Sequence, residues 1–253
     1  MTRWGSFGLA AAMVGAWVLP ATASTLEAVK KEINDKVSKY RSMRYTLKTQ
    51  SELQVIQITS TSEVEVKAEY LRKGDTVLSR VETHSKGHQK IGTEEKDAEM
   101  TIVTIDDGRF NYTLTETKKE RQAVKTLSGV GGGANPMNPM AVFKQAERIF
   151  DAKLLPDETV DGKPVYVIEM MPKTDALKKR VGRTLSYYDK KTGLGLKTLV
   201  YDGRGKVMTT TIMTDIQINA DLRPERFVFK PPAGVTVVDA TQRSNAGGRR
   251  PGN

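Results

Sequence analysis

Short β-rich runs separated by tight turns fill the stretch from Tyr187 to Asp239. Two turn clusters, at residues 189–193 and 202–205, interrupt these runs. Their glycines supply the positive-φ positions that hairpin turns need. The stretch therefore predicts an antiparallel meander of strand, turn, strand, turn and strand. A meander of this kind buries one face, so apolar residues from elsewhere in the chain must cover that face.

The first 23 residues have the features of a secretory signal peptide. Arg3 gives a basic start, an apolar run spans residues 7–19, and Ala21 and Ala23 occupy the small-residue positions before a cleavage site. Ser24 then begins the mature chain. The apolar run is short for a membrane span, and a retained membrane anchor is the alternative. We therefore expect a soluble protein in the periplasm.

The chain contains no cysteine, and its formal net charge is +10. The first property excludes a lipid anchor on cysteine, disulfide bonds and thiol catalysis. The second suits transient contact with an anionic membrane surface. We do not expect nucleic acid as a partner, because the protein is exported and the sequence has no basic stripe with interleaved aromatic residues.

The sequence predicts two helices. Between Ser24 and Tyr40, apolar residues recur at steps of three and four, as on one face of an amphipathic helix. The second helix follows a glycine- and proline-rich stretch, residues 129–139. Asn138 can cap this helix, Pro139 suits its first position, and the pattern runs to about Phe150.

In most of the remaining chain, apolar and polar residues alternate with a period of two, which predicts strands. A change of phase at Ile56 predicts a bulge near Val55. We expect a loop or long hairpin end over residues 84–97, one helical turn within 172–179, and a disordered basic tail over 240–253. Further strands are expected near residues 43–55, 64–70, 76–83, 100–105, 109–115, 121–127, 165–171 and 183–189 and through the meander.

About ten or eleven strands, two helices and no βαβ rhythm predict an α+β fold that is mainly antiparallel. A single sheet of this width curls or closes. The expected architecture is one domain, residues 24–239. It is a strongly curved open half-barrel with the N-terminal helix and the short second helix against its concave face.

Short motifs in the C-terminal part of the chain point to a known family. They read Asp189-x-x-Thr-Gly-Leu-x-Leu-Lys, Tyr201-Asp-Gly-x-Gly-Lys, Thr214-Asp-Ile and Phe227-x-Phe-x-Pro-Pro-Ala-Gly-Val. With Asp107-Gly-Arg before an aromatic strand, they resemble the outer-membrane lipoprotein-sorting proteins of the LolA-like (LolA–LolB) superfamily. The resemblance covers most of residues 25–239.

The resemblance implies an open half-barrel with a helical lid over an apolar cavity. The superfamily includes soluble carriers, their lipid-modified receptor, and envelope-stress regulators that bind a signalling partner. The lack of cysteine favours the carrier or the regulator form. The functional arginine of the family could correspond to Arg41, Arg44 or Arg72, and no motif decides among them.

Other candidate chemistry in the sequence is weak. His84 and His88 have the spacing of a metal pair, but polar residues and Gly87 surround them, which favours a solvated loop. Residues 129–134 match a dinucleotide fingerprint loosely, but the βαβ context is missing, so we interpret them as a hinge. We therefore expect no metal, no cofactor and no enzymatic activity. A hydrolase is the lowest-ranked alternative.

The expected function is binding. The ligand would be lipoprotein acyl chains or another lipid, held in the apolar cavity for sorting to the outer membrane. The alternative is a regulator-like module that binds a membrane-protein partner. Methionine suits loosely defined apolar ligands. The candidate residues of the cavity or lid lie on the two predicted helices and at the start of the second: Leu26, Val29, Ile33, Met137, Met140 and Phe143.

Overall fold

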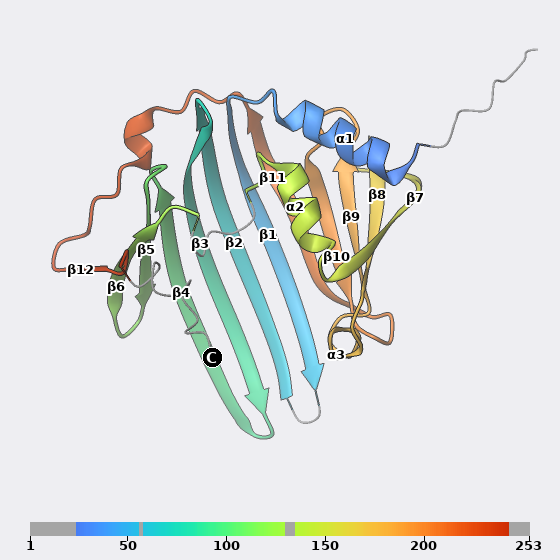
Figure 1. Cartoon of the computed structure of the whole chain (residues 1–253). Helices are drawn as coiled ribbons and strands as arrows, with labels where there is room; N and C mark the ends of the chain where they lie inside the picture. Colours follow the sequence, from blue (N-terminus) through green and yellow to red (C-terminus); the bar gives the residue numbers. More distant parts are fainter. Residues whose placement is uncertain (1–23, 56–57, 130–134, 243–253) are drawn as a thin grey trace, which may run out of the picture.

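The computed structural model describes residues 24–55, 58–129 and 135–242 (Figure 1). The expected signal peptide, with Ala21 and Ala23, lies outside the described residues, and so do most of the expected tail and of the expected glycine hinge. Ser24 is described and lies just before the first helix. Among the described helices, none is long and apolar enough to cross a membrane.

The described residues form one open sheet of twelve strands in the order β12-β6-β5-β4-β3-β2-β1-β11-β10-β9-β8-β7 (Figure 1). Neighbouring strands are antiparallel, except that β12 runs parallel to β6. The strands are β1 Ser42–Val55, β2 Ile58–Lys73, β3 Thr76–Ile91, β4 Glu94–Asp106, β5 Phe110–Thr117, β6 Arg121–Leu127, β7 Phe150–Val160, β8 Lys163–Pro172, β9 Arg183–Asp189, β10 Gly195–Tyr201, β11 Val207–Ile218 and β12 Val237–Asp239.

The predicted fold class is confirmed: the molecule is an α+β half-barrel built on an open, mainly antiparallel sheet. The meander of β9, β10 and β11 is also confirmed. Two strands were not expected, β12 and β7. Strand β7 was not expected because Pro156 interrupts the apolar pattern of the sequence before β8. In the structure, Pro156 lies inside β7, where the register shifts between Leu155 and Glu158. An edge strand tolerates proline at such an irregularity, since no outer neighbour needs its N–H.

The predicted bulge near Val55 is wrong. Val55 pairs with Ile58, and the register between β1 and β2 is unbroken, so β1 ends in a hairpin at this point. The change of phase in the sequence falls between the end of β1 at Val55 and the start of β2 at Ile58. The irregularity in β1 lies instead between Arg44 and Thr46, opposite β11. Residues 84–97 form the far end of the long β3–β4 hairpin.

Three α-helices and one short 3-10 helix complete the described chain. Helix α1 (Leu26–Val37) follows Thr25, whose hydroxyl accepts a hydrogen bond from the Ala28 amide at 3.2 Å. Helix α2 (Pro139–Ala146) has the predicted Asn138 cap and the predicted proline start, but it ends before Phe150, which begins β7. Helix α3 (Asp175–Lys178) is the expected single turn, and η1 spans Pro224–Phe227.

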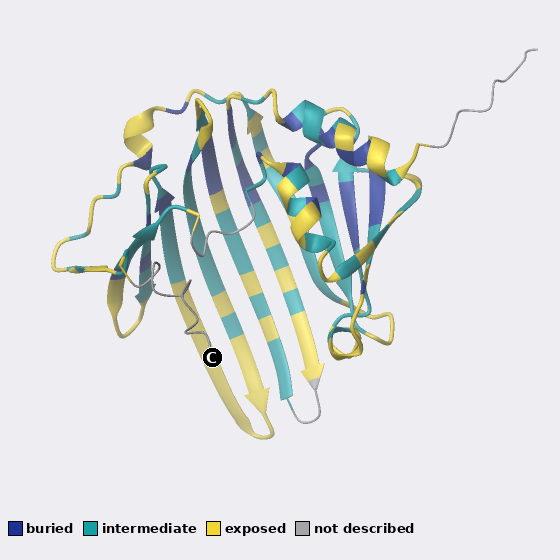
Figure 2. Cartoon of the chain, viewed as in Figure 1, coloured by how far each residue is buried: buried dark blue, intermediate teal, exposed yellow. Residues whose placement is uncertain are grey.

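Helices α1 and α2 cover the concave face near one end of the strands (Figure 1). Burial follows this arrangement. The strands are buried beside the helices, whereas the opposite ends of β1, β3 and β4 are largely exposed and that of β2 is of intermediate burial (Figure 2). The core therefore occupies one end of the half-barrel, and the concave face continues beyond it towards α3.

The segment after β11, residues 219–239, crosses the convex face and is here called the C-terminal strap. Phe227 is 1% exposed and packs against Leu78 and Leu222. The ring of Phe229 stacks on that of Tyr112, with centroids 5.0 Å apart and an interplanar angle of 10°. Strand β12 then pairs with β6. The strap thus runs from the middle of the sheet to its edge.

Candidate functional site

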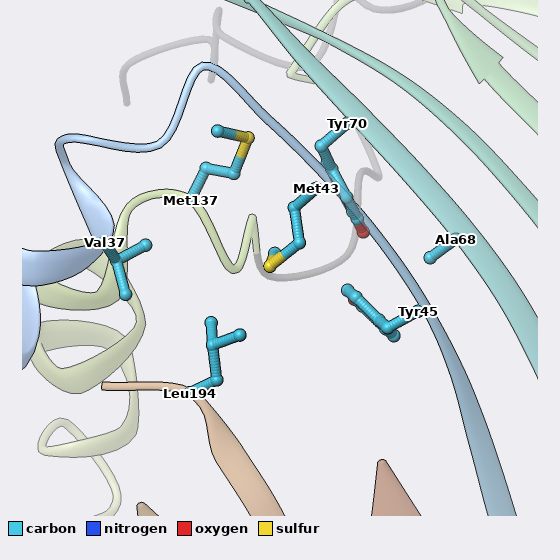
Figure 3. Packing of buried hydrophobic residues seen from close by; sticks show 7 residues of the cluster. All are labelled: Val37, Met43, Tyr45, Ala68, Tyr70, Met137 and Leu194. Carbon is cyan, nitrogen blue, oxygen red and sulfur yellow. The ribbon is translucent and has the colours of Figure 1, made fainter. Parts of the chain in front are cut away.

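Two buried clusters attach the helices to the concave face. The first brings together side chains from α1, β1, β2, the segment before α2 and the turn before β10 (Figure 3). Tyr45 and Tyr70 stack within it, with ring centroids 6.0 Å apart. The residues of this cluster are Val37, Met43, Tyr45, Ala68, Tyr70, Met137 and Leu194.

The second cluster lies where α1 and α2 cross β8. Val29 and Ile33 of α1 pack with Phe143 of α2 against Tyr166 and Ile168, and all five are buried. This contact explains the helical period of the N-terminal segment: the residues that recur at steps of three and four are those that meet the sheet.

A cavity of about 400 Å³ lies under α2, between the two clusters. Helix α2 contributes Val142 and Phe143 to its wall, β1 contributes Tyr45 and Leu47, and β11 contributes Met213. These side chains are apolar apart from one tyrosine hydroxyl. The cavity therefore favours an apolar ligand and provides van der Waals contact on several sides.

The rest of the wall comes mainly from the meander. Leu194 and Leu196 extend the apolar lining, and Tyr188 lies beside Phe143, with ring centroids 5.7 Å apart. Burial raises the pKa of Tyr188 to about 12, so this phenol is neutral at physiological pH. Thr198 and Thr211, which pair across β10 and β11, add hydroxyl groups to the lining.

The turn between β9 and β10 holds α1 in place. Gly193 has φ +73°, and a Cβ atom there would lie 3.1 Å from the carbonyl oxygen of Ile33. Tyr40 donates a hydrogen bond to the Thr192 carbonyl at 2.6 Å. The Asp189 carboxylate organises the turn itself by accepting from Thr192 Oγ1 at 2.8 Å. The Asp-x-x-Thr-Gly motif thus positions the helix that closes one end of the concave face.

An ion pair links the two helices to each other, and a hydrogen bond links α1 to the sheet. Lys30 of α1 is 3% exposed and pairs with Glu147, the C-cap of α2, and with Glu27 at 2.7 Å. Burial opposes the charge of Lys30, but hydrogen bonds to these carboxylates outweigh burial and hold its pKa above the ordinary value. Glu32 of α1 accepts a hydrogen bond from Tyr166 of β8 at 2.8 Å.

Of the three arginines that the sequence leaves open, Arg72 lies beside the helices. Its Nη2 donates to the carbonyl oxygen of Met137 at 3.1 Å, and its Nε donates to that of Tyr40 at 3.4 Å. Arg44 instead pairs with Glu69 at 2.8 Å on the convex side. Arg41 is exposed. Arg72 therefore connects β2 to the segment that leads into α2.

The six residues predicted for the cavity or lid occupy different positions. Phe143 lines the cavity. Val29 and Ile33, on the buried face of α1, pack in the same cluster as Phe143. Leu26 packs at the edge of the same cluster. Met137 is 2% exposed and belongs to the first cluster. Met140 is half-buried on α2, and it is not one of the described residues that line the cavity.

Most of the cavity wall, in particular Tyr45, Leu47 and Met213, was not predicted from the sequence. The alternation along β1 already placed Tyr45 and Leu47 on one face. The cavity could not be predicted because the position of α2 was unknown. The periodicity of a sequence does not tell which part of a sheet face a short helix covers. Leu194 and Leu196 lay within a recognised motif, but the motif indicated a turn and not a lining.

The two histidines lie on strand β3, in the long hairpin end that was one of the two expectations for residues 84–97, and not in a solvated loop. His84 contacts Glu82 at 2.9 Å and Thr101 at 3.0 Å, and His88 contacts Asp97 at 2.8 Å. Both side chains are partly exposed. Within the described ranges, no group of three or more histidine, cysteine or acidic residues is placed to hold a metal ion.

No protein-family model and no curated protein sequence matches this chain. Solved structures are similar to it at low sequence identity. MucB is 17% identical with a TM-score of 0.44, and the match covers 81% of this chain and 62% of the MucB chain. The present chain thus spans less than two thirds of the MucB chain.

Two further solved structures are matched over nearly their whole length. A putative outer membrane lipoprotein-sorting protein domain from Vibrio parahaemolyticus is 11% identical, with 80% of this chain and 95% of that chain covered and a TM-score of 0.35. A LolA superfamily protein from Nitrosomonas europaea is 12% identical, with 82% and 99% covered and a TM-score of 0.30. Solved structures similar to this chain therefore include LolA-superfamily and lipoprotein-sorting proteins.

Proposed function

We propose that this protein is an exported, non-enzymatic binding protein that shields an acylated or lipidic ligand, in the sorting of lipoproteins to the outer membrane. The observation that carries the proposal is the cavity of about 400 Å³ under α2, whose wall is mostly apolar. Moving an acyl chain from water into such a site gains roughly 0.8 kcal/mol for each methylene group buried.

Helix α2 is the element that would move to admit the ligand. It has only eight residues, and it supplies Val142 and Phe143 to the cavity wall. Its two ends are held by polar contacts, Arg72 to the Met137 carbonyl on one side and Lys30 to Glu147 on the other. Such contacts can break and re-form without disrupting the sheet, so α2 suits the role of a lid.

The proposed location is the periplasm, where an acyl chain must cross water between two membranes. Removal of the expected signal peptide takes away one charge, that of Arg3, and lowers the formal net charge from +10 to +9, which supports transient contact with anionic membrane surfaces during uptake and release. The regulator-like alternative would use a free sheet edge to bind an extended segment of a membrane protein. Strand β7 is such an edge, but Pro156 and the register shift interrupt it, so we favour the carrier.

The substitution Val142→Glu tests the proposal. It places a carboxylate in the cavity wall, and we expect at least tenfold weaker binding of a fluorescent C16 fatty acid, because the charge must be desolvated when the chain enters. The measurement is a fluorescence titration of the mature protein.

Ala141→Glu is the matched control, since Ala141 is the exposed neighbour on the same helix. It introduces the same charge outside the cavity and should leave the affinity unchanged. A wild-type protein that binds no acyl probe, or a Val142→Glu variant that binds as well as the control, would contradict the proposal.

A further inference from the structure

A second, larger cavity lies at the end of the strands away from α1, where α3 is found (Figure 1). Its volume is about 790 Å³. The end of β1, the segment 178–181 and the β10–β11 hairpin form its wall. Five of the side chains in this wall are cationic: Lys178, Lys179, Arg180, Arg204 and Lys206.

The positive charge of this wall is only partly neutralised. Lys206 pairs with Glu52 at 2.8 Å, and Lys178 pairs with Asp175 at 3.3 Å. The carboxylate of Asp202 accepts two backbone amides of its own turn, at 2.9 and 2.8 Å. The wall itself has five cations and two carboxylates, those of Glu52 and Asp202, which leaves an excess of three positive charges; Asp175 lies outside the wall and reduces this excess to two.

Three of these cations have no carboxylate partner within the described part of the chain. They are the exposed side chains of Lys179, Arg180 and Arg204. Uncompensated cations around one concavity raise the local concentration of anions. Guanidinium groups also bind phosphate and carboxylate oxygens with two parallel hydrogen bonds. This cationic cluster is therefore suited to an anionic group.

The same strands connect the two cavities. Leu47 lines the first cavity and Leu53 the second, and alternate residues of β1 share a face. Between them, the hydroxyl groups of Thr49 and Thr211 hydrogen bond at 2.9 Å, and those of Ser51 and Thr209 at 3.0 Å. Six residues of strand span about 20 Å. That length is comparable with one leaflet of a membrane, about 15 Å of hydrocarbon.

We propose that the ligand is an anionic amphiphile whose acyl chain occupies the cavity under α2 and whose phosphate or carboxylate head group contacts Lys179, Arg180 and Arg204. This inference rests on the proposed function and narrows its ligand class. The hydroxyl groups between the two cavities would then lie beside the part of the ligand that joins its acyl chain to its head group, where ester or hydroxyl oxygens occur.

The experiment compares two probes with the same acyl chain, lysophosphatidylglycerol and lysophosphatidylcholine, by isothermal titration of the mature protein. The first has a net negative head group and the second a zwitterionic one. We expect the wild-type protein to bind the anionic probe at least tenfold more tightly. The preference should shrink as NaCl is raised, because salt screens exposed charges.

The triple variant Lys179→Gln, Arg180→Gln and Arg204→Gln should lose most of this preference and keep its affinity for the zwitterionic probe. A control triple variant removes three charges elsewhere, at positions that are exposed and form no ion pair within the described residues. It carries Lys96→Gln, Lys118→Gln and Lys119→Gln, and it should keep the preference.

The outcomes separate the two proposals. Equal binding of both probes, or a preference that survives in the first triple variant, would overturn the anionic head-group site and leave the proposed function intact. Failure of both probes to bind would refute the proposed function itself. Inorganic phosphate is the third probe. If it binds the cluster as tightly as the anionic lipid does, the cluster is a free-anion site and the inference is wrong.

Discussion

At the scale of single residues, Glu32 connects α1 to the sheet. Its carboxylate accepts hydrogen bonds from Lys36 and from the Tyr166 hydroxyl, and these bonds hold its pKa below the ordinary value. Burial and the bond to Glu32 raise the pKa of Tyr166 to about 12. The pair is therefore a charged acceptor and a neutral donor throughout the physiological range.

This contact makes the stability of the folded protein depend on pH, and the direction of that dependence can be predicted. In the unfolded chain a glutamate titrates near pH 4.3. Because the folded protein holds Glu32 ionised to a lower pH, the unfolded state binds more protons in this window, and stability falls as pH falls through the folded pKa. Urea unfolding between pH 5 and pH 3 should show a shallower loss of stability for Glu32→Gln than for the wild type.

Glu63→Gln is the control for this series, because Glu63 is exposed on β2 and has no ion pair within the described residues. It should reproduce the wild-type slope. Equal slopes in all three proteins would show that the Glu32 contact does not couple folding to pH.

At the scale of elements, α2 is held more by its neighbours than by its own length. Eight residues form too short a helix to be stable alone in water, so packing and end contacts must stabilise it. Phe143 supplies the packing, and Arg72 supplies a contact at the N-terminal side.

Loss of the Arg72 contact should therefore loosen α2. Arg72→Met keeps an apolar stem of similar length and removes the charged donor, whose hydrogen bonds are worth about 1.5–3 kcal/mol each. We expect amide hydrogen exchange over residues 139–146 to be at least tenfold faster than in the wild type. Lys73→Met, which changes the exposed neighbour, should leave the exchange unchanged. Unchanged exchange in Arg72→Met would mean that this contact does not hold the helix.

The same scale shows how far the sequence predicts the structure. The Asn138 cap of α2 and the turns of the meander were predicted correctly, because each depends on contacts within a few residues. The bulge near Val55 was wrong because a hairpin turn and a bulge both change the phase of an alternating pattern. Strand β7 was missed because proline is excluded from central strands but tolerated at an edge.

The candidate site was harder to predict than the fold. Phe143, one of the residues predicted for the cavity or lid, lines the cavity, whereas Tyr45, Leu47 and the cationic cluster were not predicted from the sequence. Their roles depend on which distant segments meet. Arg180 and Arg204, for example, approach one cavity only because β9 and β10 pair.

At the scale of the whole molecule, the C-terminal strap braces the convex face. Arg226 binds the Glu69 carboxylate with two hydrogen bonds of 2.8 and 2.9 Å, and Phe227 is fully buried beside them. Strand β12 extends this brace to the edge of the sheet. One segment thus fixes strands that are far apart in the sheet order.

Truncation of the buried ring should therefore be costly. Phe227→Ala removes a fully buried aromatic side chain, for which the expected loss of unfolding free energy is about 3–5 kcal/mol. Val228→Ala, at a neighbour that is 55% exposed, should change it by less than about 0.5 kcal/mol. Both values come from urea unfolding of the mature protein. A loss below about 1 kcal/mol for Phe227→Ala would show that the strap does not contribute to global stability.

The sheet ends at β7 on one side and β12 on the other, and these two strands do not pair. In a closed barrel, strand number and shear fix the radius. Here the sheet can widen or narrow without gaining or losing any interstrand backbone hydrogen bond. The width of the concave face is therefore set by side-chain packing, so the proposed carrier could accommodate ligands of different width on one sheet.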